Sequence, residues 1–145
     1  MLLLEALTEK TRDALLAAGW TPERTVDVSG LKADIEYWGY HWNGHAEAFF
    51  KRFAFLRPGY ADFDFISRDI DFGYDSERLA YIAEVIGQSL CPLGYCDEQN
   101  TGLLMAEDGS VYWAIDGDHG FLADTYVEAL NKTFARERGH WFCDD

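Results

Sequence analysis

In the first part of the chain, apolar residues recur every three or four positions, a spacing that predicts helices. The first apolar face consists of Leu4, Leu7, Thr11, Leu15 and Ala18. Gly19 follows this face and is suited to end the helix, because glycine tolerates the backbone angles of a helix C-terminus. Ser29 is placed to cap a short helix over residues 31–38, and Asn43 is placed to cap the next one. The buried stripe of that next helix consists of Ala46, Phe49, Phe50 and Phe53.

The pattern changes over residues 61–74, where apolar and acidic residues alternate. A period of two is typical of half-buried strands, because neighbouring side chains on a strand point to opposite faces. A further helix is expected to begin at Asp75 or Ser76. Its apolar face is predicted to consist of Leu79, Ile82, Ala83, Ile86 and Leu90.

Two apolar runs, residues 103–106 and 111–115, flank a polar segment at residues 107–110. The Asp108–Gly109 step in that segment favours a tight hairpin, because the turn needs residues that tolerate positive φ. We therefore expect a pair of antiparallel strands in this part of the chain.

A short strand is expected near Phe121, followed by a final helix that starts at Thr125. Thr125 and Glu128 have the spacing of a capping box. The buried face of this helix is predicted to consist of Val127, Leu130 and Phe134. The order of elements indicates an α+β fold, with helices packed on a mostly antiparallel sheet. We expect one domain over residues 1–139 and a loosely ordered tail over residues 140–145.

The composition agrees with one folded domain, since 48% of the 145 residues are apolar and 16% are aromatic. The 26 acidic residues outnumber the 12 Lys and Arg residues, which gives a formal net charge of −14. A chain with this charge would repel nucleic-acid phosphates and anionic membrane surfaces, so neither is an expected partner. No export signal or membrane-spanning stretch is recognisable, and three cysteines cannot all pair with one another. We therefore expect a monomeric protein of the cytoplasm.

One pattern resembles zinc-dependent deaminases, which use an H-x-E motif followed by P-C-x-x-C. Here His45 and Glu47 have the first spacing, and Cys91 and Cys96 would supply the two thiolates. Pro92 follows its cysteine instead of preceding it, and the two cysteines are further apart than in the motif. A small zinc-dependent deaminase or hydrolase is therefore the alternative interpretation. The favoured interpretation has no catalytic residue, no metal and no cofactor.

Acidic residues dominate the second half of the chain, where no Lys or Arg occurs between Arg78 and Lys132. A high net charge keeps a protein soluble, and it also allows an acidic face to attract a cationic partner. We predict that a partner binds a surface made of Asp62, Asp64, Asp69, Asp71, Tyr95, Asp97, Glu98, Glu107, Asp108, Asp116 and Asp118. Tyr74, Tyr112 and Trp113 are further candidate anchors, although core packing is the favoured role for aromatic residues on strands.

The segment over residues 15–27, LLAAGWTPERTVD, resembles the opening motif of the SUKH superfamily, specifically its third family of bacterial immunity proteins. Further segments that resemble the family follow in the expected order, at residues 46–53, 86–94, 101–105, 108–112 and 128–130. The AGWTPER run is the most specific part of the likeness. Residues 55–59 depart from the family pattern, since relatives tend to have a phenylalanine and two glycines there.

The resemblance implies an α+β antidote without enzymatic activity, which protects a bacterium by binding a polymorphic toxin, frequently a nuclease or a nucleic-acid deaminase. Such a toxin needs a basic cleft to attract phosphates, so carboxylates on this chain can mimic the phosphates and occlude that cleft. A third interpretation is a regulatory binding module, a role of eukaryotic members of the superfamily. Within the opening motif, Trp20 and Pro22 are expected to be structural, and Arg24 is expected to donate hydrogen bonds that hold the turn.

Overall fold

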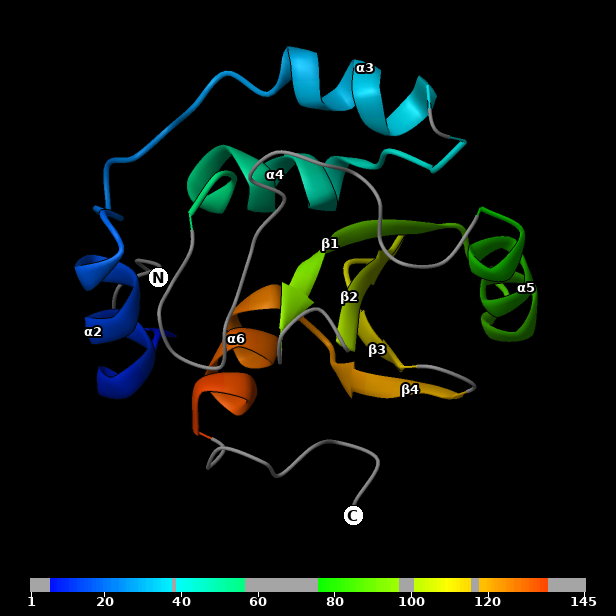
Figure 1. The fold of residues 1–145 in the computed structure, drawn as a ribbon. Helices are drawn as coiled ribbons and strands as arrows, with labels where there is room; N and C mark the ends of the chain where they lie inside the picture. Colours follow the sequence, from blue (N-terminus) through cyan, green and yellow to red (C-terminus); the bar gives the residue numbers. More distant parts are fainter. Residues whose placement is uncertain (1–5, 38, 57–75, 97–100, 116–117, 136–145) are drawn as a thin grey trace.

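The computed structural model describes residues 6–37, 39–56, 76–96, 101–115 and 118–135 (Figure 1). These residues form five helices and a four-stranded antiparallel sheet, which confirms the expected α+β class. The helices are α2 (Glu9–Ala17), α3 (Ser29–Tyr37), α4 (Gly44–Phe53), α5 (Ser76–Ile86) and α6 (Tyr126–Ala135). The strands are β1 (Leu90–Cys96), β2 (Thr101–Ala106), β3 (Val111–Ile115) and β4 (Asp118–Ala123). The strands predicted over residues 61–74 and the tail predicted over residues 140–145 lie outside the described residues.

Polar side chains mark the starts of four described helices: Thr8 caps α2, Asn43 and Thr125 cap two others as predicted, and Asp27 lies at the start of α3. The side chain of Asn43 caps α4 and accepts a hydrogen bond of 2.8 Å from the third amide of the helix. The hydroxyl of Thr125 accepts a bond of 3.2 Å from the third amide of α6 in the same way. The prediction for Ser29 is wrong, because Ser29 is the first residue of α3 rather than its cap. The Asp27 carboxylate accepts hydrogen bonds from the amide and the hydroxyl of Ser29.

The helix in the middle of the chain is shorter than its apolar spacing predicts. α5 ends at Ile86, and Gly87 adopts a φ of 88°, a left-handed conformation that ends the helix. Leu90, predicted to lie on the face of this helix, is instead the first residue of β1. β1 is not apparent from the sequence because Pro92 and Gly94 are poor strand formers. In the structure these two residues lie at a shift of register, and among the described strands β1 pairs only with β2.

The four strands lie side by side in chain order, β1-β2-β3-β4, and each pair is antiparallel. The predicted hairpin is confirmed, since β2 pairs with β3 and Gly109 in their turn has a φ of 92°. The strand expected near Phe121 is confirmed as β4. The β2–β3 turn leads into Val111 at the start of β3, whereas Asp118 pairs with Ile115 at the end of β3, so the turn and Asp118 lie at opposite ends of that strand.

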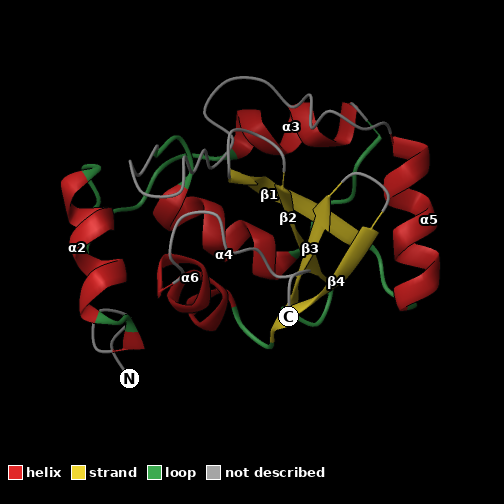
Figure 2. Cartoon of the chain, turned by 60° about the horizontal axis from the view of Figure 1, so that its bottom comes forward, coloured by secondary structure: helices red, strands yellow, loops and turns green. Residues whose placement is uncertain are grey.

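The helices surround the sheet unevenly (Figures 1 and 2). Both views place α2 and α5 at opposite ends of the molecule and α4 between α3 and α6. α4 and α5 contact β1, whereas α6 contacts both β4 and α2. The largest fully buried side chains include the predicted stripe of α4 and come from every layer: Leu15, Trp20, Ile35, Phe49, Phe50, Phe53, Ile82, Leu90 and Phe134. The predicted core positions of α4 are therefore confirmed.

Arg24 joins the segment after α2 to the end of α4. Its two terminal nitrogens donate hydrogen bonds of 2.6 and 2.7 Å to the backbone oxygens of Arg52 and Ala54. Carbonyl groups at the end of a helix lack partners within the helix, so the guanidinium supplies the missing donors. Trp20 is buried close by, with its ring stacked on Phe53 at a centroid distance of 5.8 Å. The structural roles expected for Arg24 and Trp20 are confirmed.

Candidate protein-binding surface

A cleft of about 470 Å³ lies where the end of α5, the start of β1 and the β2–β3 turn meet the segment that leads into α4. Its apolar lining includes Leu79 and Leu90, which are both buried. Its larger polar lining residues are His41, Glu84, Gln88, Ser89 and Glu107. An apolar lining interrupted by a few polar groups is a common composition for a binding site.

The β2–β3 turn is fixed against the end of α5 by residues that line this cleft. The side-chain nitrogen Nε2 of Gln88 donates to Oδ2 of Asp108 at 3.1 Å, and the backbone amide of Asp108 donates to Oε1 of Gln88 at 3.0 Å. The hydroxyl of Ser89 donates a second link, to Oε1 of Glu107. This edge of the cleft is therefore held in place before any partner binds.

Asp108 also shapes its own turn. Its Oδ1 accepts hydrogen bonds from the amide and the hydroxyl of Ser110, at 2.9 and 2.5 Å. These bonds from Ser110 are the main reason that the pKa of Asp108 lies below its ordinary value, and Gln88 and the nearby His45 lower it further. Both carboxylate oxygens of Asp108 thus have partners within the chain. Asp108 can contribute its charge to an interface, but three of the roughly four acceptor positions of its carboxylate are already used.

The N-terminus of α4 closes the other side of the β2–β3 turn. The ring of His45 covers Gly109, and a methyl group added at Gly109 would lie 2.9 Å from Nδ1 of that ring. The side chain of Asn43 donates a hydrogen bond of 3.3 Å to the backbone oxygen of Met105, at the end of β2. The turn is consequently packed between α4 and the end of α5.

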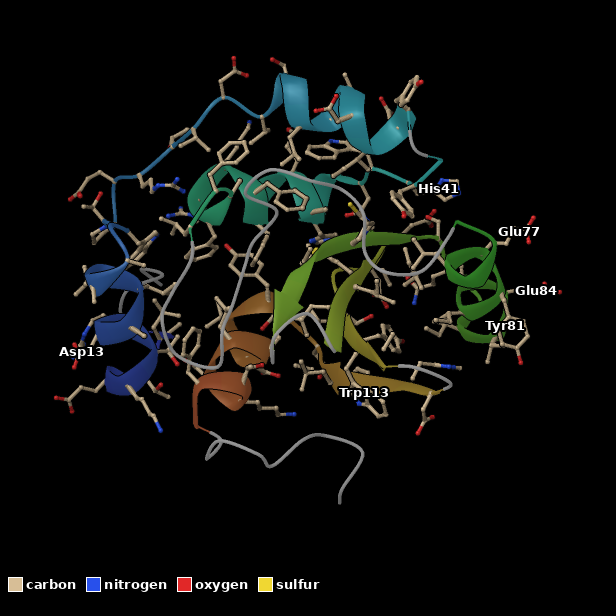
Figure 3. All side chains as sticks on the ribbon, viewed as in Figure 1. Asp13, His41, Glu77, Tyr81, Glu84 and Trp113 are labelled. Atoms are coloured by element: carbon tan, nitrogen blue, oxygen red, sulfur yellow. The ribbon has the colours of Figure 1, made fainter. Side chains whose placement is uncertain are left out.

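One face of α5 carries exposed apolar and acidic side chains (Figure 3). Tyr81 and Val85 lie one helical turn apart and are 63% and 56% exposed. Glu77 and Glu84 are exposed on the same helix, and Figure 3 shows Glu77, Tyr81 and Glu84 pointing outward from the edge of the molecule. Glu84 also lines the cleft, so the helix face continues into it. We call the combined region the α5 surface, made of Glu77, Tyr81, Glu84, Val85, Gln88, Ser89 and Glu107.

The α5 surface shares only one residue with the partner-binding set predicted from the sequence, Glu107. The sequence does contain a signal for the apolar residues of the α5 surface. The helical spacing that places Leu79 and Ile82 in the core leaves Tyr81 and Val85 on the opposite, exposed side of the helix. Acidic residues draw attention through the net charge, whereas an exposed aromatic residue on a helix is noticed only once the buried face is known.

The described residues of the predicted partner-binding set fall into two groups. Glu107 and Asp108 are exposed in the β2–β3 turn, beside the cleft. Asp118 is exposed at the start of β4, at the other end of β3, and the backbone of Tyr95 lies at that end as well. The structure therefore does not bring these four residues into one patch. Tyr74 and the side chain of Tyr95 lie outside the described residues. The other predicted positions lie outside them as well: Asp62, Asp64, Asp69, Asp71, Asp97, Glu98 and Asp116.

Trp113 occupies the core, the role favoured for aromatic residues on strands. It is 7% exposed, and its ring lies so close over Gly120 that a methyl group there would come within 2.6 Å of it. Tyr112 is half-buried and meets Phe121 edge-on at a centroid distance of 5.6 Å. Trp113 is therefore not available as an anchor for a partner.

The residues of the zinc alternative are occupied by other contacts. Glu47 accepts a hydrogen bond from the indole of Trp42, and His45 packs on the β2–β3 turn. Cys91 is buried in β1, and this burial raises the pKa of its thiol, which disfavours the thiolate form that binds zinc. Across the described residues, no three His, Cys, Asp or Glu side chains are grouped so that they could hold a metal ion. The side chain of Cys96 lies outside the described part.

Comparison with protein families explains this combination of fold and motif. Residues 7–135 match the family model described as SUKH-3 immunity protein, a span that includes every described helix and strand. The chain belongs to the SUKH-3 immunity protein family. Comparisons with curated proteins and with solved structures found no match. In the described part of this SUKH-3 protein, no helix has the length and apolar character needed to cross a membrane.

Proposed function

We propose that this SUKH-3 protein is an immunity factor that binds a cognate protein toxin in the cytoplasm and neutralises it by covering a basic site. It acts as a monomer, one copy per toxin, without catalysing a reaction and without a cofactor. The family match over residues 7–135 carries the proposal, because the family that it shows is described as one of immunity proteins. The charge of the chain supports the finer part, the basic character of the toxin.

The distribution of charge favours a cationic partner. The formal net charge is −14, and no Lys or Arg occurs from residue 79 to residue 131. The acidic residues described in that stretch are all exposed: Glu84, Glu107, Asp108, Asp118, Asp124 and Glu128. Carboxylates in water lose little by remaining unpaired, so this excess is compatible with folding. It gives the surface a negative potential that speeds association with a basic protein.

A nuclease or a nucleic-acid deaminase is the kind of toxin that fits this potential. Such an enzyme must attract phosphates, so its substrate cleft is basic. An inhibitor that presents carboxylates to the same cleft uses the attraction that the enzyme has for its substrate. The enzyme cannot discard its basic residues without losing activity, which makes its active site a durable target.

The first experiment tests protection and binding together. Candidate toxin domains encoded by the genes next to this one are expressed one at a time in a bacterial host with and without the SUKH-3 chain, and growth is followed. We expect growth to be restored by the wild-type chain, and the purified pair to elute as a one-to-one complex. The proposal fails if a neighbouring toxin is active and neither growth nor elution changes, a result that would favour a regulatory module with another partner.

The second experiment tests the acidic surface. Asp62, Asp64, Asp116 and Asp118 are changed together to lysine, and association with the toxin domain is followed by stopped-flow at several salt concentrations. We expect association to slow steeply and its dependence on salt to flatten, because attraction between opposite charges is screened by ions. Circular dichroism checks that the variant remains folded. Unchanged kinetics would place the interface away from these four residues.

A further inference from the structure

We propose that the α5 surface is the part of the chain that anchors the toxin, an inference that rests on the proposed function. A protruding lysine or arginine of the toxin lays the aliphatic part of its side chain on Tyr81 and Val85. Its cationic end enters the cleft that Glu84 and Glu107 line. The occupant is therefore a basic side chain on a protein surface.

The apolar part of this surface is unusual within the described residues. Tyr81 and Val85 are more than half exposed, and at a spacing of four they are neighbours on the helix. The other large exposed apolar side chains are Leu16, Tyr37, Phe55 and Phe121, and none of them lies on α5, the helix that supplies Glu84 to the lining of the cleft. Tyrosine is enriched among the residues that contribute most to protein interfaces, because it offers a large apolar area together with a hydroxyl. Tyr81 therefore has the exposure and the chemistry of an anchor.

The charge of the α5 surface selects a cation. Glu77, Glu84 and Glu107 are exposed, and within the described residues none of them forms an ion pair. Ser89 occupies Oε1 of Glu107, while Oε2 accepts no hydrogen bond from a described residue. Apart from Arg78, whose side chain lies outside the described part, α5 carries no cation of its own. An approaching lysine or arginine is thus the partner that satisfies these carboxylates.

Lysine and arginine also match the apolar part of the surface. Both have a hydrocarbon stem that packs on apolar groups while the charged end stays in a polar environment. Arginine can in addition stack on the face of a tyrosine ring, which adds an attraction between its charge and the ring electrons. Nucleic acid offers no such cation, and its phosphates would be repelled by the three carboxylates.

The cleft edge needs little reorganisation to receive a partner. The paired hydrogen bonds between Gln88 and Asp108 hold the β2–β3 turn, and Ser89 orients Glu107. A site that is already ordered loses less conformational entropy on binding, so more of the contact free energy contributes to affinity. α5 itself is anchored by Leu79 and Ile82, which are buried.

The test compares matched variants at the two ends of the molecule. Tyr81→Ala and Glu84→Lys alter the α5 surface, and Leu16→Ala and Asp13→Lys make equivalent changes on α2 (Figures 1 and 3). All four residues are exposed, so the fold should tolerate each change, and thermal unfolding followed by circular dichroism checks this. The dissociation constant for an inactivated form of the toxin domain encoded beside this gene is measured by titration calorimetry. Tyr81→Phe is included because it keeps the ring.

We expect Tyr81→Ala and Glu84→Lys each to raise the dissociation constant at least about tenfold, as central interface residues do. Tyr81→Phe should stay within about twofold of the wild type because it keeps the ring, and Leu16→Ala and Asp13→Lys should do so because α2 lies away from the proposed contact. If the wild-type chain binds and the α5 variants bind equally well, or if the α2 variants weaken binding as much as the α5 variants do, this inference is overturned and the proposed function still stands. Absence of binding by the wild-type chain overturns the proposed function, and this inference with it.

Discussion

Gln88 and Asp108 are joined by two hydrogen bonds that run in opposite directions. The side chain of Gln88 donates to the carboxylate of Asp108, and the backbone amide of Asp108 donates back to the side-chain oxygen of Gln88, at 3.1 and 3.0 Å. The side chain of Gln88 thereby gives the backbone amide of Asp108, in the turn, a hydrogen-bond partner. It also fixes the turn that carries Glu107 relative to α5.

Removing this side chain should loosen the turn. We expect Gln88→Ala to lower the free energy of unfolding by about 1 kcal/mol, since two partly solvated hydrogen bonds are lost. Gln88→Glu should cost more at neutral pH, because it places a second carboxylate beside Asp108. Urea denaturation measures both, with Glu36→Ala on the exposed side of α3 as the control. Equal stability of Gln88→Ala and the control variant would contradict the role assigned to Gln88.

The turn also gives the protein a defined dependence on acid. Folding lowers the pKa of Asp108, mainly through hydrogen bonds from Ser110, so the ionised carboxylate stabilises the folded state. This stabilisation is complete above the pKa of the unfolded chain, about 3.9, and is lost as the pH falls through the lower pKa of the folded state. We expect the free energy of unfolding of Asp108→Asn to decline less than that of the wild type below about pH 4. Urea titrations of the two chains at a series of fixed pH values measure this, and parallel curves for Asp108→Asn and the wild type would contradict it.

Two glycines should respond to the same substitution in opposite ways. Gly109→Ala is expected to lower the free energy of unfolding by about 1–3 kcal/mol, because its φ is positive and the added methyl group meets His45. Gly30→Ala should raise it by about 0.5–1 kcal/mol, because Gly30 lies inside α3 and the methyl group meets nothing within 4 Å.

A double variant separates the two causes at Gly109. His45→Ala combined with Gly109→Ala removes the clash with the ring but keeps the unfavourable φ, so only part of the lost stability should return. Chemical denaturation of the four chains gives the coupling between the two positions. Complete recovery in the double variant would mean that the backbone conformation contributes nothing.

The hydrogen bonds of Arg24 should make it one of the least replaceable polar residues of the fold. Arg24→Ala leaves the backbone oxygens of Arg52 and Ala54 without their donor, and we expect a loss of about 2–3 kcal/mol in the free energy of unfolding. Arg24→Lys should recover less than half of this, since an ammonium cannot reach both oxygens with the fixed geometry of a guanidinium. Arg12→Ala is the comparison, because the guanidinium of Arg12 reaches the carboxylate of its neighbour Asp13, at 3.8 Å, and no other carboxylate among the described residues. Similar losses for Arg12→Ala and Arg24→Ala would contradict this assignment.

Cys91 should be chemically inert in the folded protein. It is fully buried, and its thiol pKa is raised, so neither access nor ionisation favours reaction. In a Cys96→Ser, Cys143→Ser background, we expect Cys91 to react with a disulfide reagent at pH 8 only as fast as the chain unfolds. Reaction in urea serves as the positive control. Immediate labelling of the native protein would show that the thiol is accessible, and the zinc alternative would then need to be reconsidered.

The helices could be predicted from local patterns because local chemistry decides them. The cap at Asn43 and the stripe of Phe49, Phe50 and Phe53 are properties of adjacent residues, and the structure confirms them. The hairpin at Gly109 was predictable for the same reason. β1 was not, because a strand that contains Pro92 and Gly94 is stabilised by its pairing with β2 and by burial rather than by its own propensity.

The cleft could not be predicted because it depends on contacts between distant segments. Gln88 and Asp108 are 20 residues apart, and nothing in their neighbouring sequence indicates that they meet. The net charge shows that acidic residues are in excess, but it does not show where in the fold they lie. Asp108 precedes β3 and Asp118 follows it, so the two residues lie at opposite ends of that strand. This separation depends on how the strands pair, which composition does not show.

The position of Arg24 has a consequence for how such proteins can diversify. Arg24, in the opening motif of the family, holds the segment after α2 against the end of α4. The exposed side chains of α5 take no part in these hydrogen bonds, so this role does not restrict them. If α5 anchors the toxin as proposed, exchange of its outward side chains would change which toxin is recognised while the rest of the fold stays the same. Substitutions on that helix could then follow changes in a toxin without weakening the contacts that stabilise the fold.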